Sequence, residues 1–243
     1  MRAAIITDIH ANLAGLRVVL DRIADLRADT ILCLGDVVGY NPWPNECVSI
    51  IRDMSIRCVM GNHDRVAAGL QEPDHFNAMA REAILWTRHV LSDEHREFLS
   101  RLPDRIAFDE STILVHGSPR DPDEYILTTS CARENTQFME ERLGTSVCFF
   151  GHTHVTGVFD RAQDGWIDTD EGVVLRSGNA YLVNPGSVGQ PRDGDPRSSF
   201  LVYDTEGRAA RFYRIPYDIG SVQEAIAQEG LPAHLGQRLF LGR

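Results

Sequence analysis

The sequence predicts an α/β fold, and three observations lead to this prediction. In the first 60 residues, short apolar runs rich in β-branched residues alternate with segments in which apolar residues recur at helical spacing. After Pro103 the pattern changes to short strands joined by short links. The length of 243 residues suits one sizeable hydrophobic core. We therefore expect one domain over residues 1–243, an α/β unit with an antiparallel extension.

The N-terminal part alternates strand-like and helical patterns. Leu13, Leu16 and Val19 begin a series of apolar residues at helical spacing. Pro44 can open the second helix, because proline in the first turn costs no hydrogen bond. A β-α-β-α-β order predicts a parallel sheet with right-handed crossovers. The expected elements are strand 3–6, helix 13–26, strand 30–34, helix 44–53 and strand 56–60.

The remainder of the chain is expected to begin with helices and to continue mainly as strands. Residues 64–100 show a mostly helical pattern, clearest at 76–90. The C-terminal tail, residues 219–243, has a helical pattern in its first half. Between these segments we expect a hairpin of strands 105–108 and 112–116, a polar loop 117–129, a helix 132–143, and strands 146–150, 155–159, 173–176, 180–183, 200–203 and 209–213.

Composition limits the function classes. The formal net charge of -11 and the pI near 5.2 disfavour a stable complex with nucleic acid. A small phosphate substrate remains compatible, because bound divalent cations would invert the local field. Every basic residue is arginine. The five cysteines are odd in number and show no CxxC spacing, which fits a reducing cytoplasm. No run approaches the ~20 apolar residues of a membrane span, and the early strand pattern gives no sign of a signal peptide.

The ends of five strand-like runs carry residue types that bind metals. Ligands gather outside the carboxyl ends of strands in open α/β sheets, so residues far apart in sequence can meet at one rim. Residues i and i+2 of an extended segment point the same way, which lets each Asp-x-His or His-x-His pair reach one site. The five segments are Asp8-Ile9-His10, Gly35-Asp36, Gly61-Asn62-His63-Asp64, His116-Gly117 and Gly151-His152-Thr153-His154.

Each segment alone also has an ordinary structural explanation. Gly35-Asp36 is a common turn, and an isolated His116-Gly117 is usually a loop histidine. The five together, in this order and all at strand ends, are not explained by turn chemistry. Imidazole and carboxylate ligands without thiolate suit Mn, Fe, Co, Ni or Zn better than Ca.

In this order, the five segments resemble the calcineurin-like metallophosphoesterase superfamily, and most closely its small prokaryotic phosphodiesterase branch. The resemblance spans roughly residues 1–188 and includes Asn184-Pro185-Gly186-Ser187. It implies a four-layer α/β/β/α sandwich with mixed sheets and a dinuclear metal site at the rim. It also implies hydrolysis of phosphate esters, with a hydroxide between the two metals as nucleophile.

The resemblance further implies individual roles. His63 would contact the substrate phosphate and protonate the leaving oxygen, and Asp64 would orient His63. One divalent metal would bind Asp8, His10, Asp36 and His154, and the other Asp36, Asn62, His116 and His152, so that Asp36 bridges them.

One departure from the superfamily affects the substrate prediction. The superfamily often shows Gly-Asp-x-x-Asp, followed by Arg in its phosphomonoesterase and protein-phosphatase branches. Here the segment continues as Val37-Val38-Gly39-Tyr40. The missing Arg would have been a fork for a dianionic phosphate, so we expect a preference for small phosphodiesters.

Several residues and functions remain open from sequence alone. Asn12 either supports the site or opens the first helix, and Arg120 and Arg192 lie in loops that could border the cleft. His75, His89, His95 and His234 are expected to be surface or helix residues. Alternative functions are a phosphomonoesterase, a nucleotide pyrophosphatase or a nuclease on the same metals, or a protein-binding scaffold without catalysis. The natural substrate, native metals and oligomeric state are not specified by these patterns.

Overall fold

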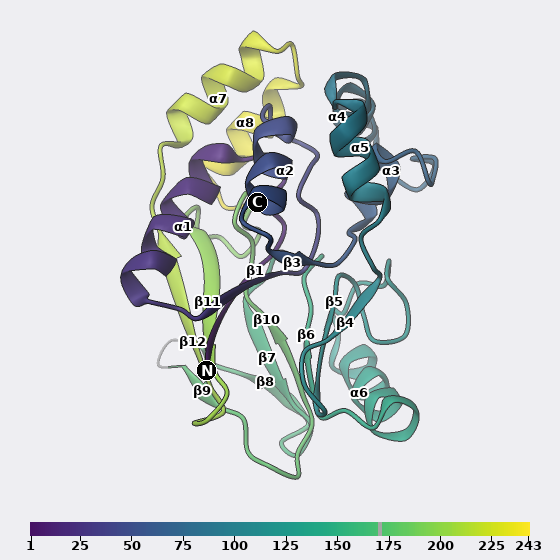
Figure 1. Cartoon of the computed structure of the whole chain (residues 1–243), viewed down its shortest axis with the longest axis vertical. Helices are drawn as coiled ribbons and strands as arrows, with labels where there is room; N and C mark the ends of the chain where they lie inside the picture. The colour runs from purple at the N-terminus through teal and green to yellow at the C-terminus, as the bar shows by residue number, and fades with distance from the viewer. Residues whose placement is uncertain (170–171) are drawn as a thin grey trace.

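A computed structural model describes residues 1–169 and 172–243, and it confirms the α/β/β/α sandwich with two mixed sheets (Figure 1). The first half contains β1 Arg2–Ile6, α1 Leu13–Leu26, β2 Thr30–Cys33, α2 Pro44–Asp53, β3 Arg57–Cys58, α3 Asn62–Ala67, α4 Ala78–Val90, α5 Asp93–Ser100, β4 Arg105–Ala107 and β5 Thr112–Val115. The second half contains α6 Thr129–Phe138, a π-helical turn Met139–Leu143, β6 Val147–Phe149, β7 Gly157–Asp160, β8 Gly165–Ile167, β9 Val173–Val174, β10 Tyr181–Asn184, β11 Ser198–Asp204, β12 Ala209–Ile215, α7 Ile219–Gln228 and α8 Ala233–Leu239.

Each sheet combines parallel and antiparallel pairs. The first has the order β3-β2-β1-β11-β12-β9. Its β1, β2 and β3 are parallel, as the alternating strand and helix patterns predict, whereas β11 pairs with β1 in the antiparallel sense. The second has the order β4-β5-β6-β10-β7-β8, with β5, β6 and β10 parallel. The carboxyl ends of β1, β2, β3, β5 and β6 therefore bring their following loops to one rim.

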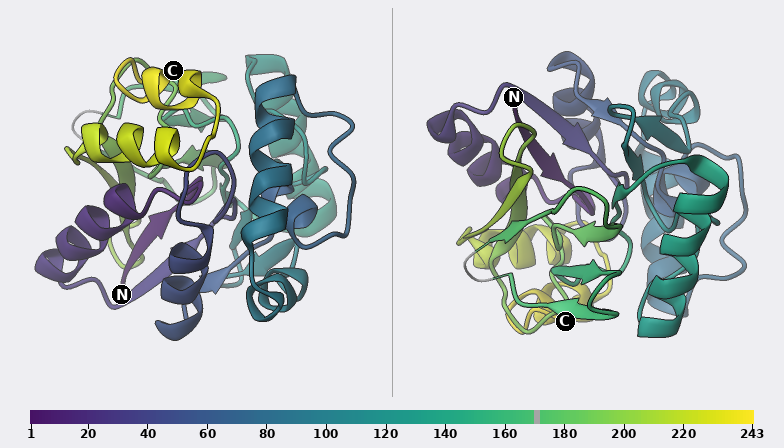
Figure 2. Two further views of the ribbon diagram at one scale, coloured as in Figure 1. Left: turned by 90° about the horizontal axis from the view of Figure 1, so that it is seen from above. Right: turned by 90° about the horizontal axis from the view of Figure 1, so that it is seen from below.

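The strands bury both faces, and their side chains alternate between two cores. In β1, Ala3 and Ile5 pack between the two sheets, whereas Ala4 and Ile6 face the layer of α1 and α2. In β6, Phe149 lies between the sheets and Cys148 faces α6. This follows from the two-residue period of a strand. The helices α1 and α6 consequently lie on opposite sides of the strands, as seen from below (Figure 2, right).

The C-terminal helices form a further buried cluster beside the rim. Val222 and Ile226 of α7 and Leu235 and Leu239 of α8 pack with Tyr40 and with alanines of α4. The sequence pattern identified α7 but not α8, which is short and follows Pro232. The helical tail thus packs against residues that precede α2, although it is the last segment of the chain.

Other boundaries differ from the predictions for local reasons. The third strand is shorter than 56–60, because the Met60 N–H donates to Pro103 O instead of continuing the ladder. The helix expected from Ala132 begins at Thr129, because the Thr128 hydroxyl caps it by accepting from Cys131 N. Asn77 caps α4 in the same way, which leaves 69–77 as a loop within the stretch predicted to be mostly helical. The edge strand β8 was not predicted.

His95 is more buried than a surface helix residue. It lies on α5, with Nδ1 2.8 Å from Asn45 Oδ1 and Nε2 3.0 Å from Ser49 Oγ. These contacts tie α5 to α2, so the role of His95 is structural. Across the described residues, the longest apolar helices fall short of what a membrane crossing requires.

Candidate metal centre

The five predicted loops converge at the rim where the two sheets meet. Backbone hydrogen bonds join them: Asp8 N donates to Gly35 O at 3.0 Å, His10 N to Asp36 O at 2.9 Å, and Gly151 N to His116 O at 2.8 Å. All seven predicted ligand side chains face one another there. Their donor atoms form two neighbouring clusters.

The first cluster contains Asp8, His10 and His154. His10 Nε2 lies 3.1 Å from His154 Nε2, and His154 Nε2 lies 3.3 Å from Asp8 Oδ1. Asp36 Oδ2 is 3.5 Å from His10 Nε2, so this carboxylate borders the cluster. The donor atoms of these three residues lie close enough together to bind one metal ion.

The second cluster contains Asp36, His116 and His152, with Asn62 beside them. His116 Nε2 lies 3.1 Å from His152 Nδ1, 3.2 Å from Asn62 Oδ1 and 3.3 Å from Asp36 Oδ2. The other oxygen of Asp36 accepts a hydrogen bond from His63 N at 2.9 Å. Asp36 therefore directs one and the same oxygen toward both clusters.

The four histidines share an arrangement that leaves one nitrogen free to bind a metal. In each ring the nitrogen that faces away from the clusters lies next to a backbone carbonyl and donates to it, so that in the neutral ring the inner nitrogen is the unprotonated one. The pairs are His10 Nδ1 with Val38 O at 3.1 Å, His116 Nδ1 with Leu34 O at 2.8 Å, His154 Nδ1 with Gln190 O at 2.6 Å, and His152 Nε2 with Asp123 O at 3.2 Å.

Asp8 shows that the first cluster is suited to a cation. Its Oδ2 accepts from Thr7 Oγ1 at 2.9 Å and from His152 N at 3.1 Å. Its Oδ1 is buried and has no hydrogen-bond partner among the described residues. A buried carboxylate oxygen without a partner is costly. A metal ion at the cluster would remove this cost, so the residues fit the divalent metal that the sequence predicts.

The loops that carry the ligands have unusual backbone conformations. Five ligand residues have positive φ angles, a region that side chains other than glycine rarely adopt. The five φ angles are 51° at Asp8, 48° at His10, 53° at Asp36, 66° at His152 and 58° at His154.

Two glycines in these loops are required because another part of the chain lies close to their backbone. A Cβ at Gly61 would lie 2.0 Å from Asp36 Oδ1, and one at Gly151 would lie 2.1 Å from Thr7 Oγ1.

Burial and mutual charge set the protonation of the ligands. Burial raises the pKa of Asp8 to about 7. Burial also acts to raise the pKa of Asp36, but His116 and His63 hold it well below its ordinary value. Burial acts to lower the pKa of His116, yet the Asp36 carboxylate raises it to about 10. Burial lowers the pKa of the remaining ligand histidines, namely His10, His152 and His154. Without metal, Asp36 and His116 thus form a buried ion pair.

His63 lies beside the clusters, but Asp64 does not orient it as predicted. The Asp64 carboxylate instead accepts from Val37 N at 2.9 Å, Val38 N at 3.2 Å and Gly61 N at 3.0 Å. It therefore fixes the Asp36 loop to the start of α3. Adjacency in sequence suggested the wrong partner, because consecutive residues at a helix start point in different directions.

Packing positions the His63 ring instead. Its centroid is 4.6 Å from those of Tyr40 and Phe76 and 4.8 Å from that of His10. Nδ1 is enclosed and has no partner in the described structure, and the backbone of Gly39 lies against it. Nε2 is therefore the nitrogen left to face the cleft. Burial lowers the pKa of His63 to about 4.

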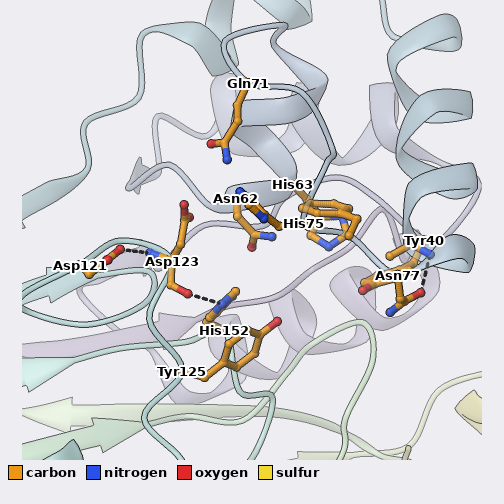
Figure 3. Close-up of a pocket in the computed structure, with 12 residues that line it drawn as sticks. Tyr40, Asn62, His63, Gln71, His75, Asn77, Asp121, Asp123, Tyr125 and His152 are labelled. Atoms are coloured by element: carbon orange, nitrogen blue, oxygen red, sulfur yellow. Dashed lines mark hydrogen bonds between the residues drawn. The ribbon is translucent and has the colours of Figure 1, made fainter.

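A cleft of about 430 Å³ opens beside the second cluster (Figure 3). Tyr125 stacks on His152 with ring centroids 3.7 Å apart. His75, expected on the surface away from the site, is exposed but lines this cleft. Neither His75 nor Tyr125 follows a predicted strand, so strand-end reasoning missed both. The lining residues are Tyr40, Asn62, His63, Gln71, His75, Phe76, Asn77, Ala80, Asp121, Asp123, Tyr125 and His152.

Asn12, Arg120 and Arg192, whose roles the sequence left open, lie at different distances from the clusters. Asn12 opens α1, since its Oδ1 accepts from Gly15 N, and its Nδ2 donates to Gly189 O at 2.9 Å. Arg120 is held away by ion pairs with Glu124 and Glu134. Arg192 lies beside the site, and its backbone N–H donates to His154 O at 3.1 Å.

The segment Asn184-Pro185-Gly186-Ser187 forms hydrogen bonds to the backbone of two of the ligand loops. Asn184 Nδ2 donates to Gly151 O at 2.9 Å, and Ser187 Oγ donates to Asp8 O at 2.9 Å. This segment therefore connects the loops after β1 and β6.

Comparisons with known proteins agree with this geometry. The model of the calcineurin-like phosphoesterase superfamily domain matches residues 1–208. An uncharacterized protein of Methanocaldococcus jannaschii, MJ0912, is 38% identical over 247 residues, which cover 99% of this chain and 98% of that protein. A metallophosphoesterase crystal structure from Sphaerobacter thermophilus matches with a TM-score of 0.88 and 40% identity, over 100% of this chain and 99% of that one.

A more distant structure shares the fold. The hypothetical protein PH1004 from Pyrococcus horikoshii matches with a TM-score of 0.82 and 21% identity, over 100% of this chain and 98% of that one. Together with the match to the family model over most of the sequence, these findings identify the family. The chain belongs to the calcineurin-like phosphoesterase superfamily.

Proposed function

We propose that the protein is a dinuclear metal-dependent phosphodiesterase acting on a small substrate. The observation that carries the proposal is the pair of ligand clusters that share one oxygen of Asp36. One divalent transition metal, from Mn, Fe, Co, Ni or Zn, would bind in each cluster. When bound, the two ions would supply Lewis acidity and activate water for in-line attack on phosphorus. All predicted ligands are present at the rim, which argues against a scaffold without catalysis.

The residues around the clusters would position and protonate the substrate. His63 lines the cleft, where a bound phosphate anion would favour the protonated ring and so oppose the effect of burial on its pKa; Nε2 would then donate a proton to the leaving oxygen. Tyr40 and Phe76 both pack against the ring, which restricts its rotation. The four ligand histidines would keep their tautomers through the backbone carbonyls that they contact, so their inner nitrogens need no rearrangement.

The cleft supports a diester more than a monoester. Its lining includes Tyr40, Phe76 and Tyr125, and two carboxylates, those of Asp121 and Asp123, border it. It therefore suits an ester arm without further negative charge. A diester has one negative charge, which two metal ions can largely balance, whereas a monoester is dianionic near neutral pH.

We therefore expect metal-loaded protein to hydrolyse diesters faster than monoesters. Bis-nitrophenyl phosphate and nitrophenyl phosphate have the same leaving group, and alkyl nitrophenyl phosphates extend the comparison. kcat/KM for the diesters should be at least about tenfold higher, which corresponds to about 1.4 kcal/mol in transition-state stabilisation. A tenfold preference for monoesters would contradict the proposed substrate class but leave a phosphoesterase in place.

We also expect two metals per chain, with affinities that depend differently on pH. Below pH 10 His116 carries a proton that a metal must displace, so affinity at the second cluster should rise about tenfold per pH unit from pH 6 to pH 8. Asp8 loses its proton near pH 7, so affinity at the first cluster should rise below that pH and level off above it.

Titration calorimetry with Mn²⁺ at pH 6, 7 and 8, in buffers of different ionisation enthalpy, measures both stoichiometry and proton release. Asp8→Asn serves as the matched variant, because it should flatten only the dependence of the first cluster. Binding of one ion per chain, or two affinities that do not change with pH, would refute the assignment.

A further inference from the structure

Arg192 places an unneutralised positive charge beside the metal centre. Its Nη2 donates to Gln190 Oε1 at 3.0 Å and to Tyr40 Oη at 3.4 Å. Its Nε is buried and has no hydrogen-bond partner among residues 1–169 and 172–243. Within the same residues no carboxylate pairs with this guanidinium, although the chain has 35 acidic residues. A partly buried charge without a counter-charge is costly unless a ligand supplies one.

Neighbouring arginines do not share this property. Arg214 pairs with Asp193, and Arg197 pairs with Asp195. Both carboxylates belong to the same loop as Arg192, and both are engaged by other arginines. Arg192 is thus left unpaired in a loop that contains the acids that could have neutralised it.

The position of Arg192 connects it to the catalytic rim. Its guanidinium carbon lies 5.8 Å from the centroid of the Tyr40 ring. The Tyr40 centroid is 4.7 Å from that of His10 and 4.6 Å from that of His63. The positive charge of Arg192 also acts to lower the pKa values of Asp8 and His10. Its field therefore reaches the first cluster and the proton donor alike.

The C-terminal tail holds this arrangement in place. Tyr40 packs among apolar residues of α7 and α8, and the Gly194 N–H donates to Gly242 O at 3.0 Å. The second contact fixes the loop two residues after Arg192. Tyr40 occupies the sequence position of the arginine in the phosphomonoesterase-like pattern. In the folded chain its hydroxyl accepts a hydrogen bond from the guanidinium of Arg192.

We propose that Arg192 binds a non-bridging oxygen of the substrate phosphoryl group, with the Tyr40 hydroxyl positioning its guanidinium. The ligand class is a phosphoryl oxyanion held at the metal centre, so this inference rests on the proposed function. A guanidinium suits this role because its planar fork matches phosphate oxygens. Both side-chain hydrogen bonds of Arg192 use Nη2, so Nη1, which is not buried and has no partner among the described residues, is available for such a bond.

The experiment measures the affinity of inorganic phosphate for Mn²⁺-loaded protein by titration calorimetry. Arg192→Ala should weaken binding about 10- to 100-fold, as expected for a lost hydrogen bond to a charged group. Arg192→Lys should recover part of the loss, because it keeps the charge but not the fork. Tyr40→Phe should cause a smaller loss than Arg192→Ala. Arg120→Ala is the matched control, since its guanidinium is paired with two glutamates, and it should bind like the wild type.

Metal content and thermal unfolding of each variant separate binding from folding. Phosphate affinity that is unchanged in Arg192→Ala, with two metals retained, would overturn the inference, and so would an equal loss in Arg120→Ala. If Arg192→Ala weakens phosphate binding but no diester is hydrolysed by the wild type, the inference holds and the proposed reaction fails. If the wild type hydrolyses diesters but its phosphate affinity does not depend on Arg192, the proposed reaction stands and the inference about Arg192 fails.

Discussion

Replacement of Asp36 by alanine is expected to reduce kcat/KM by about 10³-fold or more, the largest loss for any single ligand. Its Oδ2 lies 3.5 Å from His10 Nε2 and 3.3 Å from His116 Nε2, so it borders both clusters. Loss of this carboxylate would weaken both metal sites and leave the repulsion between the two ions less compensated. Asp8 borders only the first cluster, and Asp8→Ala should therefore cost less.

The alanine variant also removes a structural contact, so a second substitution is needed. Asp36 Oδ1 accepts from the buried His63 N–H, and losing that acceptor costs about 1–3 kcal/mol in folding free energy. Asp36→Asn keeps an oxygen for this bond but removes the charge. Steady-state rates, metal content and thermal unfolding should be measured for both variants. Near wild-type activity in Asp36→Asn, with two metals bound, would show that the bridging charge is not required.

Replacement of His63 by alanine is expected to keep both metals but reduce the rate by about 10²–10⁴-fold on diesters with alkyl leaving groups. His63 is buried beside the clusters: its ring packs against Tyr40 and Phe76, and one of its nitrogens lies within 4.8 Å of donor atoms of His10 and Asp36. General acid catalysis matters most when the leaving alcohol is a poor leaving group. The loss should therefore be much smaller for nitrophenyl esters, which depart without a proton.

His75→Ala is the matched control for this prediction. His75 also lines the cleft, but it is exposed and lies on the loop before α4. Its removal should leave the difference between alkyl and nitrophenyl substrates unchanged. If His63→Ala loses the same factor on both substrate types, then His63 does not act as a proton donor. If it loses rate on neither type while both metals remain bound, then the ring only packs in the turn.

The order of the five segments, and not any one of them alone, predicted which side chains meet at the rim. Asp8, Asp36 and His116 each follow an apolar run, and strand ends in parallel order meet at one rim. The sequence could not distinguish Arg120 from Arg192, because both lie in polar loops with similar neighbours. Their difference depends on distant residues: Glu134 reaches Arg120 from α6, whereas no carboxylate in the described chain pairs with Arg192.

Predictions failed where contacts between segments distant in sequence, and not adjacency or periodicity along the chain, determine the structure. Asp64 was assigned to His63 because the two are adjacent, but its carboxylate holds the backbone of Val37 and Val38. The helix α8 and the strand β8 are short, so periodicity gives little signal for either. In the folded chain α8 packs with α7, Tyr40 and α4, and β8 pairs with β7 at the edge of the sheet. His75 lines the cleft from the loop before α4, a position that helical periodicity does not report.

The candidate ligands are divided between the two halves of the sandwich, so neither sheet holds a complete cluster. Asp8, His10, Asp36 and Asn62 follow strands of the first sheet, and His116, His152 and His154 follow strands of the second. Metal bound at either cluster would therefore act as a cross-link between the sheets. Its apparent affinity would include the free energy of docking one sheet on the other, since binding to the docked state alone shifts that equilibrium. A substitution in the core between the sheets, far from any ligand, could then change metal affinity without altering the coordinating atoms.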